Sequence, residues 1–137
     1  MKICFIGAGS VVFTRNLLKD LSLFPEFKDL EIVLMDIDPE RLEVAKKIAE
    51  EKKETKKLKW SIKSYLEMKE AIKGSSYVVN TVQIGGKEAT YVDFDISEKY
   101  GLRQTIGDTH GIGGIMRFLR TAPFFKELVR NIEEYAW

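Results

Sequence analysis

The sequence has little of several features that mark specialised proteins. Its 137 residues include one cysteine, Cys4, so no disulfide can form within the chain, and a cytoplasmic location is expected. No apolar run approaches the roughly 18 residues of a membrane-spanning helix. The apolar N-terminus is too short for a signal peptide. The net charge is only +1, which argues against nucleic acid or an anionic membrane as a partner.

What is present is ordinary for a globular protein. Apolar residues make up 45% of the chain and charged residues 31%, and the length suits one domain over residues 1–137. One Lys-rich segment, 52–57, is interspersed with acidic residues, which favours a solvated helix end over a nucleic-acid contact.

The chain is organised around its first nine residues. The apolar run Lys2–Ile6 leads into Gly7, Gly9 and Ser10, which predicts a strand that turns sharply into a helix. In a dinucleotide-binding domain the first glycine permits the turn, and the second lets backbone N–H groups approach a pyrophosphate at the helix N-terminus. Val12 stands where the third glycine of the usual motif would be, so the bare motif is weak.

An acidic residue, Asp36, strengthens the interpretation of the glycine turn as a nucleotide-binding site. The second predicted strand, Leu30–Asp36, ends on Asp36, and Asp38 then caps a helix whose first residue is Pro39. A strand, a Gly-x-Gly turn, a helix and a strand ending in an acid predict a nucleotide half-site. The alternative is a βα turn that binds nothing.

The apolar periodicity continues this alternation of strands and helices. Further strands are predicted at 58–63, half-exposed at a sheet edge, and at 77–82, buried. Helices are predicted at 11–24, 39–53, 65–73, 93–100 and 115–135. The third of these helices should stop at Gly74, and Pro123 should kink or divide the last. Four parallel strands in the order 3-2-1-4 give an α/β, Rossmann-like doubly wound fold, truncated before a fifth strand.

Several segments together resemble one family. These are Lys2–Ser10, Leu34–Asp38 with Arg41 and Leu42, Gln83–Gly86, and above all Gly107–Arg117 followed by Leu119–Thr121. They are similar, in order and spacing over essentially the whole chain, to the N-terminal domain of glycoside hydrolase family 4. The sequences of these motifs resemble the α-galactosidase, α-glucosidase and α-galacturonidase branch more than the 6-phospho-glycosidases.

The resemblance implies an unusual glycosidase that depends on NAD and manganese. NAD would take a hydride from C3 of the sugar, a tyrosine base would remove the C2 proton beside the metal-polarised ketone, and the glycosidic oxygen would be eliminated. Water would then add and the hydride return. The implied partner is a small α-glycoside, and a homo-oligomer is expected.

The resemblance also implies roles for individual residues. The cofactor-binding positions would be Gly7, Gly9, Ser10, Asp36, Arg41, Asn80 and Gln83. Among them Asp36 would bind the adenosine ribose, which favours NAD over NADP, and Asn80 and Gln83 would line the nicotinamide side.

Asp108 would act in catalysis by raising the basicity of the tyrosine base. Its alternative role is that of a turn or N-cap acid in a glycine-rich loop. His110, the one histidine of the chain, either faces the substrate or is an ordinary loop residue, and it is not expected to be a metal ligand. Thr90 stands near the arginine that binds the sugar phosphate in the phospho-glycosidase branch, so an unphosphorylated substrate is expected.

The family's metal-binding cysteine and histidine, its Asn-Pro loop and its tyrosine base match no residue here, and Tyr91, Tyr100 and Tyr135 do not replace the base. The chain alone is therefore expected to lack activity. It would be the cofactor half of a longer or split hydrolase, or a free-standing NAD-binding module. An ordinary dehydrogenase piece would not account for the segment from Gly107 to Arg120.

Overall fold

A computed structural model describes residues 1–104 and 111–136 of the chain. The chain divides into two compact units: Met1–Val82 with Arg130–Trp137, called unit 1 here, and Gln83–Val129, called unit 2. Unit 1 holds the strands β1 (Lys2–Ile6), β2 (Glu31–Met35), β3 (Ser61–Tyr65) and β4 (Tyr77–Asn80), and the helices α1 (Val11–Leu21), η1 (Pro25–Phe27), α2 (Pro39–Lys56) and α3 (Met68–Ile72). Helix α4 (Gly86–Lys99) lies in unit 2, and the long helix α5 (Ile112–Tyr135) runs from unit 2 into unit 1.

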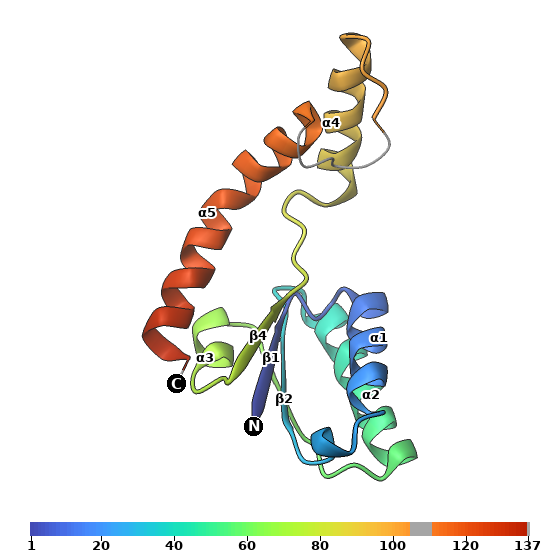
Figure 1. The fold of residues 1–137 in the computed structure, drawn as a ribbon, viewed down its shortest axis with the longest axis vertical. Helices are drawn as coiled ribbons and strands as arrows, with labels where there is room; N and C mark the ends of the chain where they lie inside the picture. The colour runs from blue at the N-terminus through green and yellow to red at the C-terminus, as the bar shows by residue number, and fades with distance from the viewer. Residues whose placement is uncertain (105–110, 137) are drawn as a thin grey trace. The chain divides into compact units, whose positions relative to one another are not determined.

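The four strands form one parallel sheet in the order β3-β2-β1-β4. This confirms the predicted α/β, Rossmann-like fold and its strand order. Helices α1 and α2 cover one face of the sheet, and α3 lies on the other (Figure 1). No helix in the described ranges is long and apolar enough to cross a membrane.

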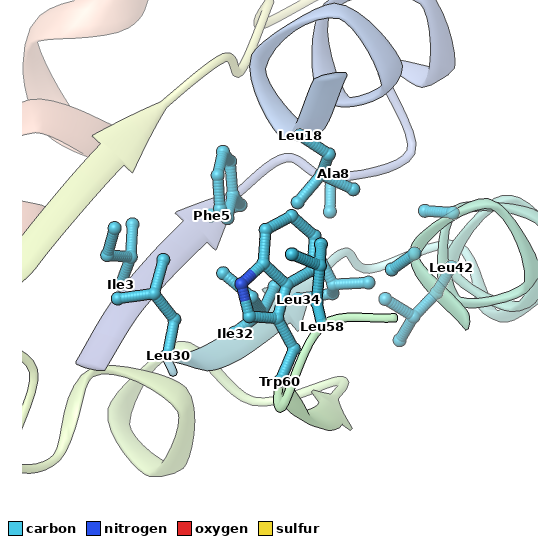
Figure 2. Close-up of a cluster of buried hydrophobic side chains, with 12 residues drawn as sticks. Ile3, Phe5, Ala8, Leu18, Leu30, Ile32, Leu34, Leu42, Leu58 and Trp60 are labelled. Carbon is cyan, nitrogen blue, oxygen red and sulfur yellow. The ribbon is translucent and has the colours of Figure 1, made fainter. Parts of the chain in front are cut away.

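The largest group of buried apolar side chains lies between the sheet and α1 and α2 (Figure 2). Trp60 is 1% exposed and its indole Nε1 donates to the carbonyl oxygen of Phe27 at 2.6 Å. Leu18 of α1 and Ile32 of β2 are fully buried in the same cluster. Burying this much apolar surface is what stabilises a domain of this size.

Two capping predictions are confirmed in unit 1. The Asp38 carboxylate accepts hydrogen bonds from the N–H groups of Glu40 and Arg41 at 3.0 and 3.1 Å, so it caps α2 ahead of Pro39. Gly74, with a φ of +69°, follows the end of α3. The Lys-rich segment 52–57 forms the end of α2, as expected.

The third strand begins three residues later than predicted. Leu58 and Trp60 are buried, but they precede β3, because Lys59 N–H donates to Lys28 O and joins this segment to the loop before β2. Tyr65, expected to start a helix, instead ends β3 beside Met35. The edge position of β3 is confirmed.

The prediction of a buried fourth strand over 77–82 is wrong in two respects. Strand β4 ends at Asn80, and Tyr77 is 59% exposed while the other three residues are half-buried. The exposure reflects its place in the sheet, since β4 pairs with β1 and lies at the second edge.

The helices of the second half are longer than predicted. Helix α4 begins at Gly86 rather than near Asp93, and α5 begins at Ile112 rather than Ile115. Pro123 lies inside α5 and does not divide it. The single-domain expectation for residues 1–137 stays a prediction.

Cys4 is fully buried in β1, as expected for a small apolar core residue. Burial raises the pKa of its thiol from 9.0 to about 12, because a thiolate would lose its hydration. In the unfolded chain the thiol ionises near its ordinary pKa. Cys4 therefore leaves stability unchanged below about pH 9 and lowers it as the pH rises from 9 toward 12.

We expect the wild type to lose about 1 kcal/mol more than a Cys4→Ala variant between pH 8 and pH 10. Urea unfolding of both proteins at the two pH values measures this difference. Equal losses in the two proteins would show that the thiol does not couple to folding.

Candidate functional site

The predicted cofactor residues of unit 1 lie at one edge of its sheet. Ile6 of β1 pairs with Met35 of β2 on one side and with Asn80 of β4 on the other. All three strands run in the same direction, so their carboxyl ends meet there. In open α/β sheets this edge is where ligands bind.

The turn after β1 requires glycine at position 7. Gly7 has a φ of +82°, and a Cβ placed on it would lie 2.8 Å from Val82 Cγ2, 3.0 Å from Val82 N and 3.1 Å from the carbonyl carbon of Thr81. The Gly7 N–H donates to Met35 O at 2.9 Å. The turn thus lies between the last residue of β2 and the segment that follows β4.

Two threonines that the sequence analysis did not single out hold the same turn. Thr81 Oγ1 donates to Gly7 O and Thr14 Oγ1 donates to Ala8 O, each at 2.8 Å. The Thr14 side chain is fully buried. For Thr14 the available signal was a hydroxyl on the otherwise apolar face of α1.

Gly9 and Asp36, far apart in the sequence, are brought together. The Gly9 N–H donates to Asp36 Oδ2 at 2.7 Å, and the Asp38 N–H donates to Asp36 Oδ1 at 3.0 Å. A Cβ at Gly9 would lie 2.6 Å from Asp36 Oδ2 and 2.8 Å from Arg41 Cβ. Two backbone N–H groups therefore fix the Asp36 carboxylate beside the glycine turn.

The N-terminus of α1 has no side-chain cap. Ser10 occupies the N-cap position, makes no side-chain capping bond, and is followed by no acid in the first turn. By contrast, Asp38 caps α2. The Val11 N–H donates to Gly9 O at 2.9 Å. Helix geometry gives the next N–H groups, those of Val12 and Phe13, no intrahelical acceptor, and the helix dipole adds partial positive charge there.

Val12 explains how the chain does without a third glycine. Its side chain is 59% exposed, so position 12 is not where α1 packs closely on the sheet. The buried contacts of α1 are made instead by Thr14 and Leu18.

Two exposed side chains flank Asp36. The Arg41 Nε lies 3.3 Å from Asp38 Oδ2, and the Arg41 side chain is 70% exposed. Ile37 is 86% exposed, which is unusual for an isoleucine. Both are accessible to a ligand at this edge.

Asn80 and Gln83 fall in different units. Asn80 Oδ1 accepts from the N–H of Val82 at 3.1 Å and closes the turn after β4. In unit 2, Gln83 Nε2 donates to Gly86 O at 3.2 Å and to Thr90 Oγ1 at 2.9 Å. The structure thus places Gly7, Gly9, Ser10, Asp36, Arg41 and Asn80 in one unit and describes Gln83 separately.

The predicted catalytic residue, Asp108, lies outside the described residues, as does His110. Among residues 1–104 and 111–136, no group of three or more His, Cys, Asp or Glu side chains could hold a metal ion. The described part of the chain therefore offers no cluster of this kind for a metal.

Comparison with known proteins gives a consistent result. The model of the family described as "Family 4 glycosyl hydrolase" matches residues 2–137. An alpha-galactosidase of Bacillus subtilis (strain 168) is 44% identical over 134 residues, which are 97% of this chain and 31% of that protein. Further curated relatives are alpha-galacturonidases and an alpha-glucosidase.

Solved structures of similar proteins agree with the family match. A 6-phospho-alpha-glucosidase from gut microorganisms, in complex with NAD and glucose-6-phosphate, has a TM-score of 0.85 and 31% identity, covering 100% of this chain and 31% of that one. A 6-phospho-beta-glucosidase from Thermotoga maritima, with manganese, NAD+ and glucose-6-phosphate, has a TM-score of 0.82 and 27% identity, covering 99% of this chain and 32% of that one. The chain thus spans about a third of the length of the proteins it matches.

Proposed function

This chain belongs to glycosyl hydrolase family 4, and from that premise we propose that it is the NAD-binding portion of an NAD- and manganese-dependent glycosidase that hydrolyses O-glycosidic bonds. The observation that carries the proposal is the arrangement around Gly9, whose N–H holds the Asp36 carboxylate at 2.7 Å beside an uncapped helix N-terminus. These are the two groups that an adenosine diphosphate needs: an acceptor for the ribose hydroxyls and a donor set for the phosphates.

The residues of unit 1 fit that half of the cofactor. Asp36 would accept from the ribose 2′- and 3′-hydroxyls, and Ser10 with the first turn of α1 would donate to the pyrophosphate. Ile37, exposed next to Asp36, would pack against the adenine ring, with Arg41 at its rim. A 2′-phosphate would meet the Asp36 carboxylate, so the site would select NAD over NADP.

The remaining roles concern the reacting end. Asn80 and Gln83 would line the nicotinamide side, and Asp108 would raise the basicity of a tyrosine base outside this sequence. When bound, NAD would supply the reversible hydride acceptance that redox-assisted elimination and water addition require. No residue of the described ranges is assigned to manganese.

We propose an unphosphorylated α-glycoside, such as an α-galactoside or α-glucoside, as the substrate. Thr90, which stands near the position of the phospho-glycosidase arginine, is uncharged, and its hydroxyl donates to Gly86 O at 3.2 Å. It therefore offers no cation to a sugar phosphate.

A chimeric enzyme tests this proposal. Residues 1–137 would replace the matching first third of the Bacillus subtilis alpha-galactosidase, and hydrolysis of an α-galactoside would be assayed with NAD+ and Mn2+. We expect activity from the chimera and none from the 137-residue chain alone. A folded chimera that binds NAD+ but leaves the galactoside intact would contradict the glycosidase role.

The alternative is a free-standing NAD-binding module, or one part of a split enzyme. Sequencing the gene beyond codon 137 distinguishes a longer hydrolase from a split enzyme. The family's Cys and His metal ligands downstream in the same frame support the longer hydrolase, whereas the same motif in a neighbouring gene supports the split enzyme.

We also propose that the chain self-associates through α5. Leu128 of α5 is 4% exposed and is therefore not part of the surface that we propose to associate. The exposed large apolar residues of α5 in unit 2 are Ile112, Ile115, Phe118, Leu119, Phe125 and Val129. Several recur at three- and four-residue spacing, as a helix-packing stripe does.

Sedimentation velocity at micromolar concentration should therefore detect dimers or larger species. A Phe118→Glu variant should shift them toward monomer, whereas Lys126→Glu, an exposed position on the same helix, should not. A wild type that stays monomeric across the concentration range would rule out self-association.

A further inference from the structure

Arg120, on α5, makes a three-way contact within unit 2. Its Nη1 and Nη2 donate to the two carboxylate oxygens of Asp93, on α4, at 3.1 and 2.6 Å. Its Nε donates to the carbonyl oxygen of Ile84 at 3.3 Å. One guanidinium thus joins both helices of unit 2 to the turn before α4.

The Asp93 pair fixes the Arg120 guanidinium in place. The Asp93 side chain is 6% exposed and that of Arg120 27% exposed, so both lie largely away from water. A buried carboxylate is costly without a partner, and the two-pronged arginine contact satisfies both of its oxygens. The same contact raises the pKa of Arg120 above its ordinary value. If the guanidinium moved away, the buried Asp93 carboxylate would lose its ion-pair partner, so the guanidinium is held in place.

The turn packs directly on the arginine. Gly85 and Gly86 have φ values of +85° and +62°, and consecutive glycines alone would leave the backbone loosely restrained. A Cβ at Gly85 would lie 3.2 Å from both Cδ and Nε of Arg120. The arginine stem and its bond to Ile84 O together restrict the two glycines.

Gln83 depends on this turn for its position. Its Nε2 donates to Gly86 O at 3.2 Å and to Thr90 Oγ1 at 2.9 Å. Both acceptors are set by where Gly86 starts α4. If the glycine turn moves, the Gln83 amide moves with it.

We propose that Arg120, held by Asp93, is a positioning residue that fixes the Ile84–Gly86 turn and thereby presents Gln83 to the nicotinamide end of the cofactor. The first half of this inference is a property of unit 2 alone. The second half rests on the proposed function, because it assumes that Gln83 serves the nicotinamide side.

An Arg120→Lys variant of the 137-residue chain tests the first half. Lysine keeps the charge beside Asp93 but lacks the planar fork and the Nε donor. NMR order parameters of Gly85 and Gly86 should fall from about 0.8 to below about 0.6, while those of residues 94–98 in α4 stay unchanged. Arg117→Lys, at an exposed position of the same helix, is the matched control and should change neither.

The second half is tested by titrating the same proteins with NAD+ and with ADP-ribose, which lacks the nicotinamide. We expect Arg120→Lys to weaken NAD+ binding about fivefold and to leave ADP-ribose binding within about twofold. Equal weakening of both ligands, or unchanged order parameters at Gly85 and Gly86, overturns the proposal. A wild type that binds neither ligand refutes the proposed function, while the order parameters still decide the role of Arg120.

Loss of order throughout α4 would mean that Arg120→Lys unfolds unit 2. Asp93→Asn, which keeps the shape and weakens the ion pair, then replaces it. Ordered Gly85 and Gly86 in that variant, with NAD+ affinity unchanged, would equally overturn the proposal.

Discussion

Replacing Gly7 with alanine is expected to lower the free energy of unfolding by about 3 kcal/mol. Two effects add at this position. The φ of +82° strains any residue with a Cβ, by about 1 kcal/mol. The new Cβ would also lie 2.8 Å from Val82 Cγ2 and 3.1 Å from the Thr81 carbonyl carbon, and relieving such overpacking costs a further 1–3 kcal/mol or so. Urea unfolding measures the sum.

Gly74→Ala is the matched control for this prediction. Gly74 has a similar φ of +69°, but a Cβ there would meet nothing within 4 Å. The control should lose only the strain of about 1 kcal/mol. Equal losses for the two variants would show that the segment after β4 does not clamp the glycine turn.

Replacing Asp36 with asparagine is expected to weaken NAD+ binding at least about tenfold. Hydrogen bonds to a charged group contribute roughly 1.5–3 kcal/mol, and the ribose hydroxyls would lose the carboxylate. Asparagine has nearly the same size, and its oxygen can still accept the Gly9 N–H now bound at 2.7 Å, whereas its NH2 group cannot accept from the Asp38 N–H that Oδ1 now binds at 3.0 Å. Losing that one bond should cost only about 1 kcal/mol of stability, so the turn should persist and the larger loss should appear in NAD+ affinity.

Asp38→Asn controls for the change of charge. It removes one negative charge two residues away, and asparagine still caps α2 because its oxygen can accept from the N–H groups of Glu40 and Arg41. NAD+ affinity should stay within about twofold of wild type. If both variants weaken binding alike, Asp36 acts through general electrostatics and not through the ribose.

The sequence was sufficient to predict the glycine turn and the neighbouring Asp36 because that information is local. A strand that runs into Gly7 and Gly9, and a second strand that ends in Asp36, carry their own signals within a few residues. Parallel crossovers of fixed hand then brought the two strand ends together and gave the order confirmed here.

Contacts between distant residues could not be predicted in this way. Nothing in the periodicity pairs Thr81 with Gly7, or Asp93 with Arg120, since these partners are set by tertiary packing. The late start of β3 has the same origin, because Lys59 is bound by the distant Lys28 carbonyl. The alternation of apolar and polar residues at 58–63 indicated which side chains are buried. It did not indicate which backbone groups would form hydrogen bonds with one another.

The most direct test of the account is a calorimetric titration of the wild-type 137-residue chain with NAD+ and, separately, with NADP+. The arrangement of Gly7, Gly9 and Asp36 predicts saturable NAD+ binding, with NADP+ at least about tenfold weaker because its 2′-phosphate meets a carboxylate. No binding at millimolar NAD+, or equal binding of the two cofactors, would contradict the assignment of this edge as an NAD half-site.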